Sequence, residues 1–75
     1  MKFNVGDIIE CINDGGYEYL KYGQQYEVTR VWNEYGNDFV DVRELGSKKS
    51  TGGFYPKRFE LVIRKQTNVN KYWSR

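Results

Sequence analysis

The sequence predicts an all-β domain, a small five-stranded and partly open barrel with a 3₁₀ turn before its last strand. Short segments rich in β-branched and aromatic residues alternate with Gly, Asn and Asp turn signals, as in antiparallel β-proteins. A length of 75 residues allows one domain with a small core. Residues 52–62 combine two glycines, the only proline and an apolar run, which predicts a strand, one tight turn and a closing strand.

The first strand is predicted over residues 8–12. Glu10 favours solvent, so Ile9 and Cys11 are expected to face the core. The run Asn-Asp-Gly-Gly then ends the strand. Residues 17–22 fit neither a strand nor a helix, and we expect a long folded loop with Leu20 in the core and three tyrosines near its rim.

The second strand is predicted over residues 24–32, which are rich in β-branched and aromatic side chains. Tyr26 and Val28 share one face of this strand, but Val31 falls on the other face. Burying all three requires one extra residue, so we expect a bulge or a strong bend near Thr29-Arg30.

A hairpin connection is predicted at residues 33–37, followed by a third strand over 38–44. Val40 and Val42 are expected to face inward on this strand. Residues 45–52 are polar and basic and are predicted to form a loop.

The fourth strand is predicted over residues 53–55. Residues 56–58 should form one 3₁₀ turn, because proline fixes φ where such a turn begins. The last strand is predicted over residues 59–63, with Phe59 and Leu61 facing inward.

The charge of the chain divides it into two parts. Residues 1–56 carry six basic and nine acidic side chains, a net charge of −3, and residues 57–75 carry six basic and one acidic, a net charge of +5. The strand pattern fades from Arg64, and residues 66–70 show no periodicity, so the barrel is assigned to residues 1–63 and residues 64–75 are expected to form a basic, mobile tail. The Tyr72-Trp73 pair would either dock on the barrel or wait for a partner.

Catalytic chemistry has little support in the sequence. The chain has no His, which excludes a Ser-His-Asp triad, a Cys-His pair and His-containing metal sites. Cys11 is the only cysteine and is expected to be a small buried apolar residue. Asp38 and Asp41 are three residues apart on one strand, which puts them on opposite faces. We expect no catalytic residue, no metal site, no cofactor and no enzymatic activity.

Two pairs of glycines, 15–16 and 52–53, lack the Gly-Lys-Ser/Thr sequence that would follow them in a phosphate-binding loop. They are interpreted as turn glycines that adopt positive φ. The start of the chain has no signal-peptide pattern, and no apolar run approaches the length of a membrane span. A single cysteine fits a reducing compartment, so the protein is expected in a cytoplasm and away from membranes.

Two sets of residues are candidates for binding. The first is an aromatic face between the long first loop and the fourth strand, suited to a protein partner. Its residues are Tyr17, Tyr19, Tyr22, Trp32 and Tyr55. The second is a set of cations concentrated toward the C-terminal third, suited to nucleic acid. Its residues are Lys48, Lys49, Lys57, Arg58, Arg64 and Lys65.

Short motifs spread over residues 3–62 resemble a known family. In chain order they are Val5-Gly6-Asp7, Cys11-Ile12, Leu20, Gly23, Tyr26-Glu27-Val28, Gly52-Gly53-Phe54-Tyr55 and Arg58-Phe59-Glu60. They resemble the SH3-like barrels, and more closely the short SH3-like proteins of bacteriophages and prophages. Peptide-binding SH3 domains usually carry a Tyr where this chain has Phe59, so Phe59 is expected in the core and a proline-rich ligand is not expected.

The resemblance implies a non-enzymatic binding module that binds and modulates a host or phage macromolecule in the cytoplasm of a bacterial host. A protein is the favoured partner, and the module itself would be a monomer or a homodimer. Nucleic-acid binding through the basic C-terminal third is the alternative. A weaker alternative is a sponge that holds a small nucleotide signal between aromatic side chains at a subunit interface.

Overall fold

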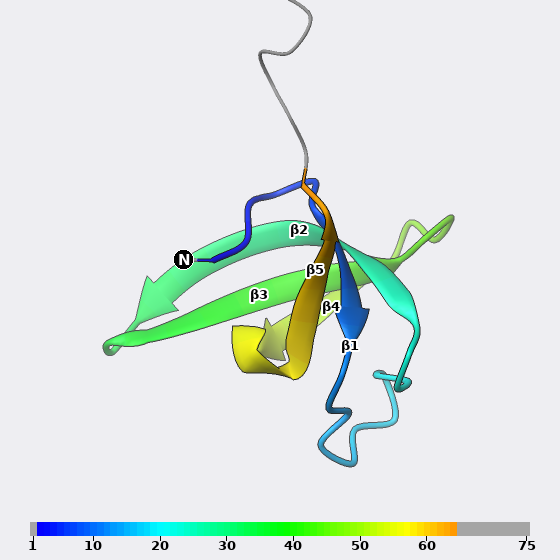
Figure 1. The fold of residues 1–75 in the computed structure, drawn as a ribbon. Coiled ribbons are helices and arrows are strands. Elements are labelled where there is room, and N and C mark those ends of the chain that lie inside the picture. Colours follow the sequence, from blue (N-terminus) through cyan, green and yellow to red (C-terminus); the bar gives the residue numbers. More distant parts are fainter. Residues whose placement is uncertain (1, 65–75) are drawn as a thin grey trace, which may run out of the picture.

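The computed structural model describes residues 2–64, which form five antiparallel strands and one 3₁₀ turn (Figure 1). The elements are β1 (Ile8–Cys11), β2 (Gln25–Glu34), β3 (Asn37–Glu44), β4 (Ser50–Phe54), η1 (Pro56–Arg58) and β5 (Phe59–Ile63). The strand order is β4-β3-β2-β1-β5. Within these residues the sheet is not closed into a barrel, because its two end strands, β4 and β5, do not pair with each other. η1 joins these two strands in sequence. The all-β prediction, with five strands and a 3₁₀ turn before the last, is confirmed.

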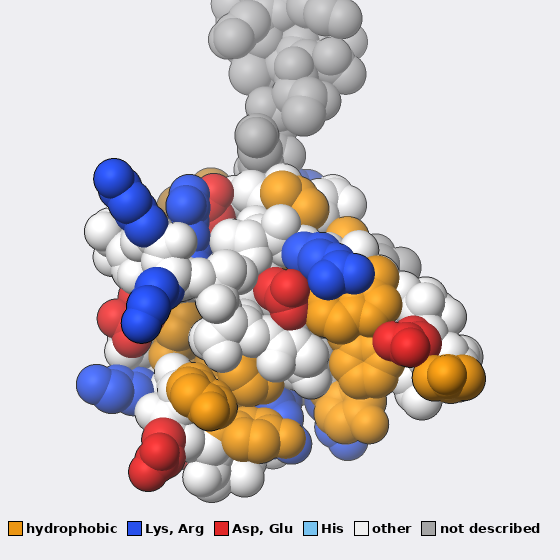
Figure 2. All heavy atoms as spheres, turned by 180° about the vertical axis from the view of Figure 1, so that it is seen from behind, with side chains coloured by type: hydrophobic (Ala, Val, Ile, Leu, Met, Phe, Trp, Pro, Cys, Tyr) orange, Lys and Arg blue, Asp and Glu red, His pale blue; other side chains and the backbone are white. Residues whose placement is uncertain are grey.

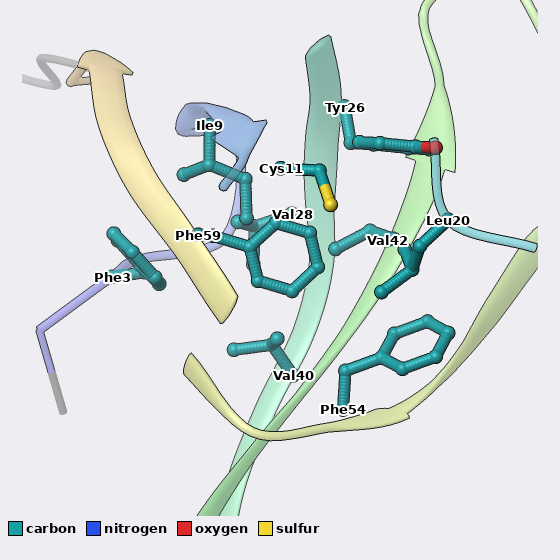
Figure 3. Packing of buried hydrophobic residues seen from close by; sticks show 10 residues of the cluster. All are labelled: Phe3, Ile9, Cys11, Leu20, Tyr26, Val28, Val40, Val42, Phe54 and Phe59. Carbon is teal, nitrogen blue, oxygen red and sulfur yellow. The ribbon is translucent and has the colours of Figure 1, made fainter. Parts of the chain in front are cut away.

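The sheet curves around a single core. Figure 1 shows β2 and β3 as a long curved ribbon that β1 and β5 cross at a steep angle. Every strand contributes to the core, and Figure 3 shows the side chains converging between the strands. The buried apolar residues are Phe3, Ile9, Cys11, Leu20, Tyr26, Val28, Val40, Val42, Phe54 and Phe59. The inward positions predicted above lie in this core, except Val31 and Leu61, which are half-buried and pack against it.

The predicted bulge in β2 is confirmed. The register of β2 and β3 shifts between Val28 and Arg30, so Thr29 is the extra residue. Val28 faces the core before the bulge, and Val31 packs against the same core after it. The bulge therefore lets both valines contribute to the core, and it turns Arg30 and Trp32 to the outer face of the sheet.

A second bulge lies in β4, where Val40 pairs with Phe54 and Asp41 pairs with Gly52. Gly53 is left over, with φ of 79°, and its N–H donates to Asp41 Oδ1 at 3.0 Å. The positive φ of Gly53 confirms the interpretation of that glycine. Gly52 does not fit the same interpretation: its φ is not in the left-handed region, but a Cβ there would overlap the Asp41 carboxylate. Close approach, and not φ, requires glycine at this position.

Several strand boundaries differ from the predicted ones, most of all at the start of β4 and at the β2–β3 hairpin. β4 begins at Ser50 and not at residue 53, because Ser50 and Thr51 pair with β3 although their sequence is polar. β2 and β3 continue through the expected connection and leave a turn at Tyr35-Gly36, with φ of 53° and 80°. Two successive residues with positive φ match the right-handed twist of long antiparallel strands.

The long loop between β1 and β2 is held by a core side chain. The Tyr26 hydroxyl accepts a hydrogen bond from Lys21 N at 3.0 Å and donates one to Tyr19 O at 3.2 Å. Burial raises the pKa of Tyr26 above its usual value of 10.0, and the bond from Lys21 offsets part of that rise. The Tyr26 hydroxyl therefore holds the middle of the loop in place, and Leu20 of the same loop fills the core beside Tyr26 (Figure 3).

Arg64 is the last described residue. Its guanidinium lies 3.5 Å from the Asp7 carboxylate and donates to Lys2 O at 3.1 Å. The rest of the predicted tail, with Lys65, Tyr72 and Trp73, lies outside the described residues. No helix among residues 2–64 is long and apolar enough to cross a membrane.

Gly52→Ala is expected to lower the free energy of unfolding by about 2–3 kcal/mol, because the added methyl group overlaps Asp41. Gly46→Ala is the matched control, since Gly46 has φ of 85° but open space around it. It should lose only about 1 kcal/mol through backbone strain. Urea unfolding followed by circular dichroism measures both, and equal losses would contradict the steric account.

Tyr26→Phe is expected to lower the free energy of unfolding at pH 8 by about 1–2 kcal/mol, since it removes both hydroxyl contacts. The loss should shrink above pH 10. Because the pKa of Tyr26 is raised in the folded state, the unfolded tyrosine ionises at a lower pH than the folded one, so Tyr26 itself makes the wild-type fold less stable as pH rises. Urea unfolding at pH 8 and pH 11 checks this, and Tyr22→Phe, at a site 74% exposed, should show neither effect.

Candidate binding surface

Three aromatic rings stack in a row on the outer face of the sheet. Trp32 stacks on Phe39 at 5.6 Å between ring centroids, and Phe39 stacks on Tyr55 at 5.4 Å. The interplanar angles are 25° and 28°, so each ring is close to parallel with its neighbour in the row. We call Trp32, Phe39 and Tyr55 the aromatic ladder.

The two bulges place the ladder. Trp32 and Phe39 are direct partners on β2 and β3, and the β2 bulge turns Trp32 outward. The β4 bulge makes Phe54 face the core, so that the next residue, Tyr55, points out toward Phe39. Cross-strand aromatic pairs of this kind stabilise a sheet by about 0.5–1.5 kcal/mol beyond their buried area.

Each end of the ladder carries a cation. The Arg30 guanidinium lies 4.3 Å from the centroid of the Trp32 ring, and Lys57 Nζ lies 5.6 Å from that of Tyr55. Glu34 accepts a long bond of 3.4 Å from the indole Nε1 of Trp32. The rings therefore contact one another along the row, and a cation lies near the ring at each end. Trp32 and Phe39 are half-buried and Tyr55 is exposed.

The three tyrosines of the β1–β2 loop are not part of the aromatic ladder. Tyr17 packs on Phe54 at 5.5 Å and lies under the Arg58 guanidinium at 5.0 Å. Tyr19 lines a shallow hollow of about 240 Å³ together with side chains of β2 and β3, the following loop and β4. Tyr22 is 74% exposed. Figure 2 shows hydrophobic side chains in two main groups on one side of the molecule, with a strip of backbone and other side chains between them.

The structure thus brings together two of the five predicted aromatic residues, Trp32 and Tyr55, through a third residue, Phe39. Phe39 is absent from the aromatic set predicted from the sequence. Its position directly opposite Trp32 across the short hairpin is the signal that would have included it.

Arg58 connects two distant parts of the chain. Its Nη1 lies 3.5 Å from Asn13 O and 3.4 Å from Asn13 Oδ1, and its carbonyl accepts bonds from the N–H groups of Ile12 and Asn13. A Cβ at Gly15 would overlap the guanidinium, so the turn lies directly against it. Its buried Nε has no hydrogen-bond partner among the described residues. Arg58 therefore fastens the β1–β2 loop to η1.

The predicted cations within residues 2–64 lie on three segments: the loop before β4, η1 and the residue after β5. Lys48 and Lys49 are exposed before β4, and Lys57 is exposed in η1. Arg58 and Arg64 are engaged within the chain, as described above. Among residues 2–64 no group of three or more His, Cys, Asp or Glu side chains is arranged to hold a metal ion.

The chain matches no protein-family model, and comparisons with curated proteins and with solved structures found no match. Its function is therefore inferred from its residues and their geometry.

Phe39→Leu is expected to loosen the ladder while keeping an apolar side chain at that position. In a Trp73→Phe background, where Trp32 is the only tryptophan, its emission should shift to longer wavelength and its quenching by acrylamide should rise. Stability should fall by about 1 kcal/mol. Tyr35→Asn, at the 93% exposed hairpin tip, should leave the spectrum unchanged. An unchanged spectrum in Phe39→Leu would show that Phe39 does not order Trp32.

Proposed function

We propose that this chain is a non-enzymatic binding module and that the aromatic ladder is its contact surface for a protein. The observation that carries the proposal is the fixed, partly exposed stack of Trp32, Phe39 and Tyr55 with a cation at each end. Tryptophan, tyrosine and arginine dominate the energetics of protein interfaces. Because the rings already hold one another, little side-chain freedom is lost on binding.

We also propose that the fold is an SH3-like barrel of the short bacteriophage type, acting in the cytoplasm of a bacterial host. The five-stranded order, the strong curvature and the 3₁₀ turn before β5 support this. The buried position of Phe59 agrees with its expected place in the core and supports a ligand other than a proline-rich peptide.

Nucleic acid is the less favoured partner. Bases bind proteins of this size by stacking on free aromatic faces above a basic groove. In the aromatic ladder the rings already stack on one another with Arg30 and Lys57 near the end rings, and two of the candidate arginines are engaged inside the chain. No contact among the described residues adds support to the nucleotide-sponge alternative.

Trp32→Ala combined with Tyr55→Ala is expected to abolish capture of the partner by the immobilised protein, because it removes both ends of the ladder. The proteins retained from a bacterial lysate are quantified for wild type, for the double variant and for a Tyr22→Ala/Tyr35→Ala control. The control removes two tyrosines that are 74% and 93% exposed and lie outside the ladder. Equal retention of proteins by the wild type, the double variant and the control would count against the aromatic ladder as the contact surface.

Fluorescence anisotropy with short DNA and RNA at two salt concentrations tests the alternative. We expect no binding at low salt. Binding that weakens steeply as salt rises would make nucleic acid the partner.

A further inference from the structure

One edge of the sheet offers unpaired backbone. Val28 N–H donates to Asp7 O at 2.9 Å and Gly6 N–H donates to Val28 O at 2.8 Å, so the polar groups of Val28 point away from β3. The direction of the backbone N–H and C=O groups alternates from residue to residue along a strand. The backbone groups of Glu27 therefore point toward β3, where Arg43 is the pairing partner of Glu27.

The same alternation continues across β3 to β4. The groups of Val42 point toward β4, and the Ser50 hydroxyl, 3.4 Å from Val42 O, lies on that side as expected. Thr51, the partner of Val42, then points back to β3. The backbone groups of Ser50 and Gly52 consequently point outward from the sheet. In the described part of the chain, Ser50 and Gly52 take part in no backbone hydrogen bond other than those between paired strands.

The opposite edge is less suitable for pairing. The register of β1 and β5 shifts between Ile8 and Ile9, which leaves Val62 as an extra residue on β5. Phe59 N–H is already used by Pro56 O. Bulges of this kind protect a sheet edge from pairing with another chain. In β4 the bulge falls at Gly53, after the two outward residues, and Ser50, Gly52 and Gly53 are all exposed.

Charge and aromatic side chains surround this β4 edge. Residues 45–59 contain no acidic side chain, and three of their cations, Lys48, Lys49 and Lys57, are exposed. The fourth cation, Arg58, is held against Asn13 and Tyr17. These cations lie just before and just after the strand. The hollow that Thr51 lines adjoins the first half of β4 and is lined by one cation, Lys49, and one acidic side chain, Glu44. Tyr55 of the aromatic ladder follows the end of the strand.

We infer that the β4 edge pairs with an extended, acidic segment of a protein partner, which adds a strand beside Ser50 and Gly52. The inference rests on the proposed function, in which the partner is a protein. Alternating N–H and C=O groups match the backbone of a peptide, whereas a phosphate backbone has only acceptors and would leave the C=O groups unmatched. The cations at both ends select for acidic side chains on the added strand.

The probe is a blocked, fluorescein-labelled eight-residue peptide of alternating glutamate and valine. A lysine-valine peptide and an eight-residue thymidine oligonucleotide serve as comparisons. At saturation, amide hydrogen exchange should slow at Ser50 and Gly52. Thr51 N–H is the internal control, because it is already paired with β3 and should not change.

Two substitutions and one peptide series sharpen the test. Lys49→Glu should weaken binding of the acidic peptide by about tenfold, a change of about 1.4 kcal/mol, while Lys2→Glu, the same charge change away from β4, should not. Ser50→Pro removes an outward N–H and should weaken binding, while Ser50→Ala keeps it. N-methylation of the peptide should weaken binding at one set of alternate positions and not at the other, whether or not the proline variant folds.

The results separate the two proposals. Binding without slower exchange at Ser50 and Gly52 would overturn the β4 edge as the site, and equal binding of the lysine-valine peptide would overturn the acidic partner. No peptide binding alongside ladder-dependent protein capture would overturn the edge inference and leave the proposed function standing. Binding of the oligonucleotide in place of the peptide, with no ladder-dependent protein capture, would overturn both.

Discussion

The extra residue in β4 determines what both faces of this small sheet can do. Gly53 adopts a positive φ, and its N–H donates to the Asp41 carboxylate. The bulge interrupts the backbone hydrogen bonds between β3 and β4, but the N–H of Gly53 still has a partner. With one residue fewer, Phe54 would turn outward and Tyr55 inward. The core would lose an aromatic side chain and the outer face would lose one end of its stack. A single hydrogen bond between neighbouring strands therefore supports the interior and the exterior together.

The parts of the fold that follow from apolar patterning could be predicted from the sequence. Alternation identified the inward residues of β1 and β3, and the phase change from Val28 to Val31 located the bulge in β2. The start of β4 was missed because Ser50 and Thr51 are polar and are selected by pairing with β3, which leaves no hydrophobic signal. The β4 bulge depends on a side chain twelve residues away in sequence, Asp41, which no local pattern reveals.

The candidate surface was predicted only in part, for a similar reason. Composition showed many aromatic residues, but which of them stack depends on register, and register depends on the two bulges. Trp32 and Tyr55 are joined by Phe39, whereas Tyr17 packs with Arg58 around the loop. The basic residues were grouped by their closeness in sequence. The structure gives Arg58 and Arg64 contacts that connect segments far apart in the chain.

The pairing of β1 with β5 has a consequence for the order in which the molecule can fold. β2, β3 and β4 are joined by short connections and can assemble from contacts that are local in sequence. β1 lies between β2 and β5, and the core that contains Phe3 also needs Phe59. During synthesis β1 therefore lacks one of its two neighbouring strands, β5, until nearly the whole described chain has left the ribosome. Such non-local closure is the step that slows the folding of small β-proteins.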